Sequence, residues 1–221
     1  MERRHFLKTA AATASGALLT ACGESEAQEK PAIGACSRLA TIPAAEPAII
    51  GPDEGEVIPD GDGRYKIRAA QLGNYWSMME LTLAPRQLLA PHTHDDYDQA
   101  VYLIEGELGF EFGGEGGEVV YGGAGSYVVK PRGLSHTFWN PSDSVTVRYI
   151  ELSANVTFEK FVDEASSAEG FVEVESTSRK HGVVFHYDQI PRLLREHNLT
   201  SIKGSAAKLP PLDENGLPER P

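Results

Sequence analysis

Two histidines stand one residue apart in the segment Pro91-His92-Thr93-His94. In an extended chain successive side chains point to opposite faces, so His92 and His94 share one face. Two imidazoles on one face can bind the same metal ion, at about 2.0 to 2.1 Å from each ligating nitrogen. This spacing therefore predicts part of a metal site.

A third histidine follows a turn later in the chain. The turn is Pro131-Arg132-Gly133, and His136 comes directly after it in a new apolar segment. Proline and glycine favour a tight turn here, which would carry His136 back toward the first pair. A single histidine in a partly buried position is more often structural than ligating. Three of them in two separate segments favour ligation by His92, His94 and His136.

The elements that must position these histidines are predicted to be strands. Between Arg64 and Glu151, short apolar or alternating runs are separated by Gly, Pro, Asn and Asp, a pattern typical of a sandwich or barrel. Two segments with helical spacing follow and are expected to pack on the barrel exterior. The predicted strands are 75–83, 99–104, 108–112, 125–129 and 145–152, and the predicted helices are 158–165 and 190–196.

Composition limits the partners and the number of domains. A chain of 221 residues without an internal repeat predicts one main domain. Lys and Arg number 20 against 32 Asp and Glu, a formal charge of −12. This balance repels phosphates, so nucleic acid is excluded as an expected partner.

The first residues predict an export signal. Arg3-Arg4-His5-Phe6-Leu7-Lys8 has the twin-arginine pattern, a short apolar run follows, and Leu19-Thr20-Ala21-Cys22 resembles a lipobox. Residues 1–22 are therefore predicted to be a signal peptide, with Cys22 lipidated and the protein held at the periplasmic face of the cell envelope. The alternative is cleavage near residues 25–27, which would leave the protein free in the periplasm.

The remaining boundaries follow from composition. Residues 23–45 lack an apolar period and are predicted to be a flexible tether. Residues 46–200 are predicted to form the domain. Residues 201–221 contain several prolines and are predicted to be a disordered tail.

Two motifs resemble those of the cupin superfamily. The second cupin motif is matched at every fixed position, and the first is matched at its two histidines and its last glycine. Arg86 stands where the first motif begins with glycine, and Gln99 stands where it has glutamate. The matching residues are Gly125, Pro131, Gly133, His136 and Asn140 in the second motif, and His92, His94 and Gly106 in the first.

Over Gly51 to Leu199 the chain is similar to single-domain, quercetin-dioxygenase-like cupins. The resemblance implies an all-β double-stranded β-helix (jelly roll) barrel with short C-terminal helices, a homodimer, and a metal at the barrel mouth with open coordination positions. It also implies Gln99 as the fourth metal ligand. A glutamine oxygen can ligate, but an amide cannot accept a proton as a base. Asp98 is the alternative, although alternation places it on the opposite face unless a bulge intervenes.

The resemblance implies a metal-dependent, dioxygenase-like oxidoreductase that acts on a small oxygenated or aromatic compound. Fe(II) is the favoured metal, with Ni, Mn, Cu and Zn as alternatives. A second hypothesis is a non-oxidative lyase, isomerase or hydrolase in which the metal activates water and a tyrosine or Asp98 supplies the acid or base. A third is a non-enzymatic binding module at the membrane surface. Fold alone does not choose among them. The side chain of Tyr97 is predicted to contribute to packing.

Overall fold

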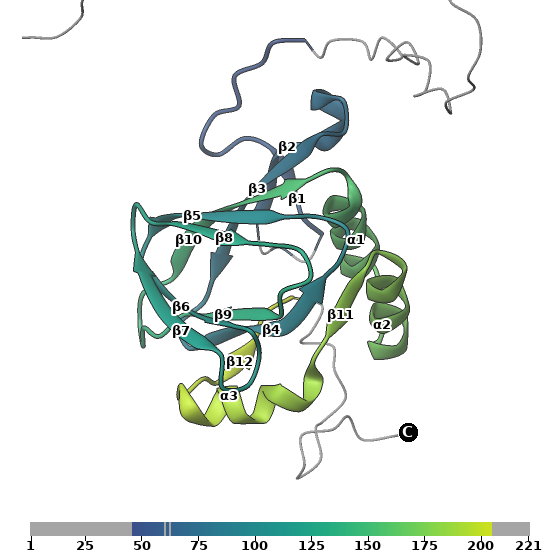
Figure 1. The fold of residues 1–221 in the computed structure, drawn as a ribbon. Helices are drawn as coiled ribbons and strands as arrows, with labels where there is room; N and C mark the ends of the chain where they lie inside the picture. Colours follow the sequence, from purple (N-terminus) through teal and green to yellow (C-terminus); the bar gives the residue numbers. More distant parts are fainter. Residues whose placement is uncertain (1–45, 60, 62, 205–221) are drawn as a thin grey trace, which may run out of the picture. The chain divides into compact units, whose positions relative to one another are not determined.

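The computed structural model describes residues 46–59, 61 and 63–204 (Figure 1). By its internal contacts the chain divides into two units, 1–41 and 42–221, and the described residues all belong to the second. The predicted signal peptide with Cys22, the tether 23–45 and residues 205–221 lie outside the described part. Within that part, no helix has the length and apolar character needed to cross a membrane.

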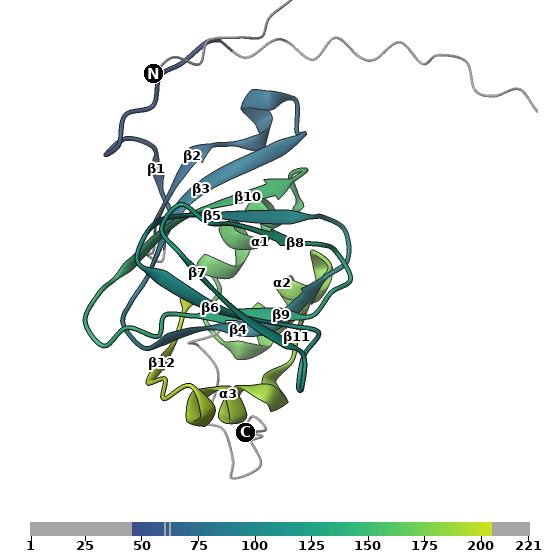
Figure 2. The ribbon, with the colours of Figure 1, turned by 60° about the vertical axis from the view of Figure 1, so that its left-hand side comes forward.

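The strands form two sheets that face each other (Figures 1 and 2). Neighbouring strands are antiparallel, except that β12 runs parallel to β4. In spatial order the first sheet is β1 (Glu56–Val57), β2 (Gly63–Ile67), β3 (Trp76–Leu83), β10 (Val147–Ala154), β5 (Gln99–Glu105) and β8 (Tyr127–Lys130). The second is β11 (Val183–Phe185), β4 (Gln87–His94), β9 (His136–Trp139), β6 (Glu107–Phe112) and β7 (Glu118–Gly123), with β12 (Ser201–Ile202) beside β4.

The apolar residues that alternate along the predicted strands lie on the inner faces of the two sheets. Along β3 and β10 every second side chain is buried, beginning with Ser77 and Val147 respectively. The inner apolar side chains of both sheets join in one core, in which Met79 and Val101 of the first sheet meet Phe138 of the second. This arrangement confirms the predicted all-β double-stranded β-helix, because apolar faces of two sheets are buried against each other.

Three helices follow the last long strand of the barrel. They are α1 (Thr157–Ser166), α2 (Phe171–Lys180) and α3 (Ile190–Glu196), and they are joined by β11 and a short 3-10 helix, Tyr187–Gln189. The helices predicted at 158–165 and 190–196 are confirmed. Helix α2 was not predicted, because its many β-branched and polar residues have weak helical preference and only a thin apolar stripe.

Helix α3 covers the outer face of the second sheet (Figure 1). Its Ile190 and Leu193 pack with Leu88 of β4 and Trp139 of β9. The predicted domain end at residue 200 is wrong, because Ser201 and Ile202 form β12 and the backbone N–H of Lys203 donates to the Leu88 carbonyl at 2.7 Å. The last described residues thus add a strand to the sheet that carries the histidines.

Arg86, which stands at the glycine position of the first motif, adopts a left-handed backbone with φ of 52°. This conformation favours glycine, so arginine here is a strained replacement. Its side chain forms an ion pair with Asp143 at the surface. The strain lies in the turn before β4 and away from the histidines.

Candidate metal centre

A bulge in β4 decides which face His92 and His94 occupy. Leu89 of β4 pairs with Phe138 of β9, whereas His92 pairs with His136, so β4 has one more residue than β9 over this stretch. Leu89 packs in the core, and strict alternation from it would turn both histidines outward. The extra residue reverses the alternation and directs them inward, as bulges near functional sites commonly do. His94 is fully buried and His92 nearly so.

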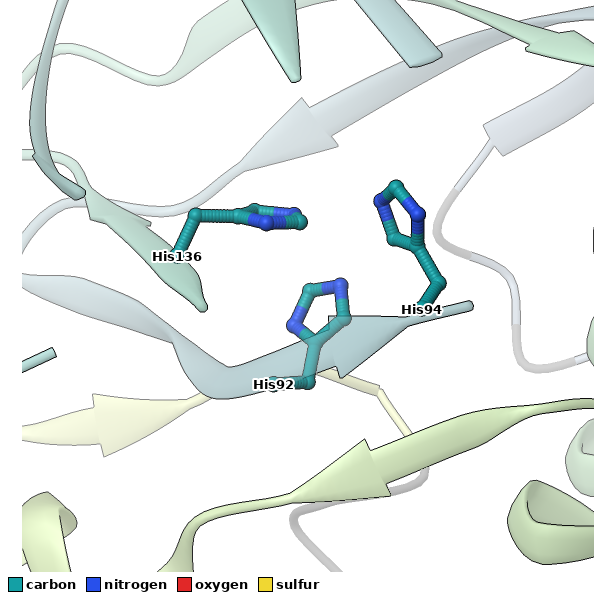
Figure 3. A group of neighbouring side chains, drawn as sticks. All are labelled: His92, His94 and His136. Atoms are coloured by element: carbon teal, nitrogen blue, oxygen red, sulfur yellow. The ribbon is translucent and has the colours of Figure 1, made fainter. Parts of the chain in front are cut away.

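The turn before β9 brings His136 to the same place, as predicted. Gly133 has a left-handed backbone with φ of 76°, and its N–H donates to the His94 carbonyl at 2.8 Å. Figure 3 shows the three imidazoles pointing toward one another. The ring centroids of His92 and His136 lie 4.4 Å apart and those of His94 and His136 lie 4.8 Å apart. One ligand atom from each ring lies within 4.8 Å of the others.

Backbone contacts orient two of the three rings. Nδ1 of His92 lies 2.9 Å from the Ala90 carbonyl, and Nδ1 of His136 lies 2.9 Å from the Leu134 carbonyl. A carbonyl only accepts hydrogen bonds, so Nδ1 carries the proton and the Nε2 lone pair is available to a metal. Among the described residues, Nε2 of His136 and both ring nitrogens of His94 are buried without a well-aligned hydrogen bond.

The three imidazoles are neutral at ordinary pH. Burial lowers the pKa of His92 to about 3 and that of His94 to about 4, and it holds the pKa of His136 far below the usual range. The positive charge of Lys130 lowers all three pKa values further. A metal binds the neutral form of histidine, so no proton has to leave before ligation. Buried, neutral, unpartnered nitrogens that converge on one point fit a divalent transition metal.

Gln99 is the first residue of β5, and Asp98 lies directly before that strand. Gln99 is buried on the inner face, where its Nε2 donates to Oγ of Ser153 at 2.8 Å. Ligation by its amide oxygen stays a prediction.

Asp98, the alternative ligand or base, is not part of the group of converging histidines. Its side chain is 51% exposed, and its carboxylate accepts hydrogen bonds from the backbone N, Nε and Nη2 of Arg132 at 2.6 to 3.1 Å. These bonds lower the pKa of Asp98 to about 2.

Sequence reasoning missed a buried ion pair between Lys130 and Glu151. Lys130 ends β8 and Glu151 lies in β10, so the two side chains meet across the intervening strand β5. The lysine Nζ donates to Oε2 at 2.9 Å and lies 2.8 Å from Oε1, and the two side chains are only 1% and 3% exposed. Burial lowers the pKa of Lys130 and raises that of Glu151, and their mutual attraction opposes both shifts.

The ion pair forms part of the wall of a cavity beside the histidines. The cavity measures about 100 Å³, and of the three histidines His92 is the one in its wall. Most of the wall is apolar and comes from β3, β10, α1 and β11. The polar residues of the wall are His92, Tyr97, Gln99, Lys130, Glu151, Ser166 and Lys203.

Comparison with known proteins agrees with this arrangement. Residues 79–153 match the model of the Cupin domain family, a segment that begins in β3, ends in β10 and contains all three histidines. Over this segment, which is about a third of the chain, the protein is thus similar to the Cupin domain family. No curated protein matches the sequence significantly.

Several solved structures are similar to part of this chain at low sequence identity. A protein of Bacillus halodurans is 13% identical with a TM-score of 0.35, over 37% of this chain and 64% of that one. A predicted oxalate decarboxylase of Thermotoga maritima is 18% identical with a TM-score of 0.38, over 42% and 78%. A double-stranded β-helix protein of Klebsiella pneumoniae is 18% identical with a TM-score of 0.37, over 54% and 91%. The chain thus spans less than two thirds of the Bacillus protein, and these similarities concern the fold alone.

Proposed function

We propose that this protein is a metal-dependent cupin that acts as a dioxygenase-like oxidoreductase on a small oxygenated organic compound. The observation that carries the proposal is the convergence of three neutral, buried histidines beside a largely apolar cavity. Dioxygen chemistry needs a redox-active metal, so Fe(II) is the favoured ion among those that imidazole ligands suit. Ni, Mn and Cu are the alternatives for dioxygen chemistry, and Zn would suit only a non-oxidative reaction.

The chain's own residues define what the site would bind. When bound, the ion supplies a Lewis acid and a template for a substrate oxygen and dioxygen. His92, His94 and His136 are neutral ligands, so they leave the double positive charge of the ion uncompensated. The ion pair of Lys130 and Glu151 adds no net charge to the cavity. An anionic oxygen on the substrate, such as a carboxylate or enolate, balances the charge best.

The cavity limits the size of the buried part of the substrate. At about 100 Å³ it is smaller than the roughly 150 Å³ apolar cavity that holds one benzene molecule. A short-chain acid or diketone fits this space, whereas a fused-ring flavonol does not. Phe158, Phe161 and Leu81 would contact the carbon skeleton and exclude water from it.

The test is anaerobic purification of the full chain, measurement of bound metal, and then oxygen uptake with a panel of short hydroxy acids, diketones and phenols. We expect close to one ion per chain and oxygen uptake with at least one compound. His136→Ala should remove both. His181→Ala is the matched control, because His181 is also buried but lies at the end of α2 outside the cluster. Bound metal below about a tenth per chain after reconstitution would overturn the proposal.

A non-oxidative lyase or isomerase is the second candidate function. The observation that favours it is the buried pair of Lys130 and Glu151, which places an acid and a base in the cavity wall. Turnover without oxygen uptake would favour this function over the first. Ligand binding without turnover would instead favour a non-enzymatic binding protein.

We also propose that the protein works as a homodimer at the cell envelope, anchored by lipid on Cys22. The support is the sequence Leu19-Thr20-Ala21-Cys22 behind the twin-arginine pattern, together with the resemblance for the dimer. Metabolic labelling with palmitate tests the anchor: Cys22→Ser should abolish the label, whereas Cys36→Ser should keep it. Label on the Cys22→Ser protein would overturn the assignment. Sedimentation of the purified protein tests the dimer.

A further inference from the structure

The pair of Lys130 and Glu151 is costly to bury, which raises the question of what it does. Two charges that leave water lose more solvation than their attraction returns unless the geometry is very favourable. Apolar residues of similar volume at such positions often give an equally stable or more stable protein. Both side chains lie in the wall of the cavity beside His92 rather than in the sealed core. Ligand recognition accounts for this placement better than stability does.

The geometry of the pair leaves acceptor capacity on one oxygen of the carboxylate. Nζ of Lys130 donates to Oε2 of Glu151 at 2.9 Å and lies 2.8 Å from Oε1, so the ammonium contacts both oxygens. Oε1 has two lone pairs, and among the described residues no group other than Lys130 donates to it. A buried carboxylate oxygen in this state is a strong acceptor for a ligand hydroxyl.

Tyr97 offers the complementary donor. Its side chain is fully buried, its ring stacks on His94 at a centroid distance of 4.5 Å, and it lines the same cavity. Among the described residues its hydroxyl has no hydrogen-bond partner. Buried tyrosine hydroxyls usually have a hydrogen-bond partner, so this hydroxyl is a second polar group that a ligand could bind. The packing role predicted for Tyr97 describes its ring but not its hydroxyl.

Tyr97 and Glu151 line the same cavity. A phenol hydroxyl can donate one hydrogen bond and a carboxylate oxygen can accept one, so the two side chains offer a ligand hydroxyl both kinds of partner.

We propose that Tyr97 and Glu151, with Lys130 holding the carboxylate in place, form a recognition site for a hydroxyl group, and that the substrate is a small hydroxy acid. The ligand hydroxyl donates to Oε1 of Glu151 and accepts from the hydroxyl of Tyr97. The acid group of the same molecule lies toward the histidine cluster, a placement that rests on the proposed function. The alternative is that the ion pair of Lys130 and Glu151 has only a structural role and connects β8 to β10 across β5.

The test compares acids that differ by one hydroxyl. The full chain is loaded with Zn(II), which is redox-silent, and isothermal titration calorimetry measures lactate against propionate and glycolate against acetate. We expect the hydroxy acid of each pair to bind about tenfold more tightly, which corresponds to about 1.4 kcal/mol. Equal affinities within both pairs, or no binding of any of the four acids, would overturn the proposal.

Two variants separate recognition from structure. Tyr97→Phe keeps the ring that stacks on His94 and removes only the hydroxyl, so the preference should fall to about threefold or less. The double variant Lys130→Met with Glu151→Leu replaces the ion pair by apolar side chains and should abolish the preference while the fold survives. Propionate affinity and zinc content should stay unchanged in both. Full preference in both variants would show that the pair is structural.

Tyr187→Phe is the matched control. The Tyr187 hydroxyl is also buried without a partner among the described residues, but Tyr187 does not line the cavity. This variant should keep the tenfold preference. The experiment distinguishes failure of the metal site from failure of the hydroxyl site. A wild-type protein that binds no zinc overturns both sites. A wild-type protein that binds one zinc per chain but has equal affinities for the paired acids overturns the hydroxyl site alone.

Discussion

Metal loading should stabilise the protein, and the gain in the free energy of unfolding depends on the metal concentration relative to its dissociation constant. A ligand that binds only the folded state at 100 times its dissociation constant contributes about 2.7 kcal/mol. For a domain of 150 to 250 residues, each kcal/mol shifts the melting temperature by about 2 to 4 °C. Saturating metal should therefore raise the melting temperature by roughly 5 to 11 °C.

Replacing His136 should remove that rise without unfolding the apoprotein. His136→Ala deletes a buried ring, which costs packing, but it also deletes a buried Nε2 that has no hydrogen bond among the described residues. A buried unsatisfied group costs about 1 to 3 kcal/mol, a value that offsets much of the 2 to 5 kcal/mol typical of a large-to-small change in a core. The metal-free variant should thus lose no more than about 4 kcal/mol.

Differential scanning calorimetry with and without added metal measures both quantities. In the wild type and in His181→Ala the metal-dependent rise should be present, whereas in His136→Ala it should be close to zero. A His136→Ala protein that keeps the full rise, or a His181→Ala protein that loses it, would refute the assignment of the site.

Three further predictions concern acidity, charge and packing. The pKa values of the two β4 histidines lie below their ordinary value of about 6.5, so the folded state disfavours their protonation. The free energy of unfolding of the apoprotein should therefore be highest above pH 6.5 and should fall by about 1.4 kcal/mol per pH unit for each histidine as the pH drops toward 4. Urea midpoints that do not change between pH 7 and 5 would contradict this prediction. Gln99→Glu adds a negative charge beside the cluster and should tighten metal binding about tenfold in a competition assay with a chelator, whereas unchanged affinity would indicate ligation by histidines alone. Gly109→Ala would place its Cβ 2.5 Å from the ring of Trp139 and should lose about 1 to 3 kcal/mol in urea denaturation, whereas Gly123→Ala, with no atom within 4 Å of the added carbon, should be nearly neutral.

The histidine cluster could be predicted because its determinants are local. The spacing of His92 and His94 places both on one face of any strand, and the Pro131 to Gly133 turn returns the chain toward them whatever the rest of the barrel does. The separation of Gln99 from Asp98 is equally local, because adjacent residues of a regular strand face opposite sides. These features depend on a few neighbouring residues, so a sequence contains enough information to predict them.

Tertiary structure decided which face was the inner one and what else lies on it. The bulge after Leu89 turned the β4 histidines toward the core, and it exists only because β4 pairs with β9 in that register. The meeting of Lys130 with Glu151 depends on two strands that are not neighbours in sequence and lie on either side of β5. A charged residue in an isolated strand is expected to face solvent, and only the closed barrel, by burying one face of both strands, makes these two charges partners within a cavity.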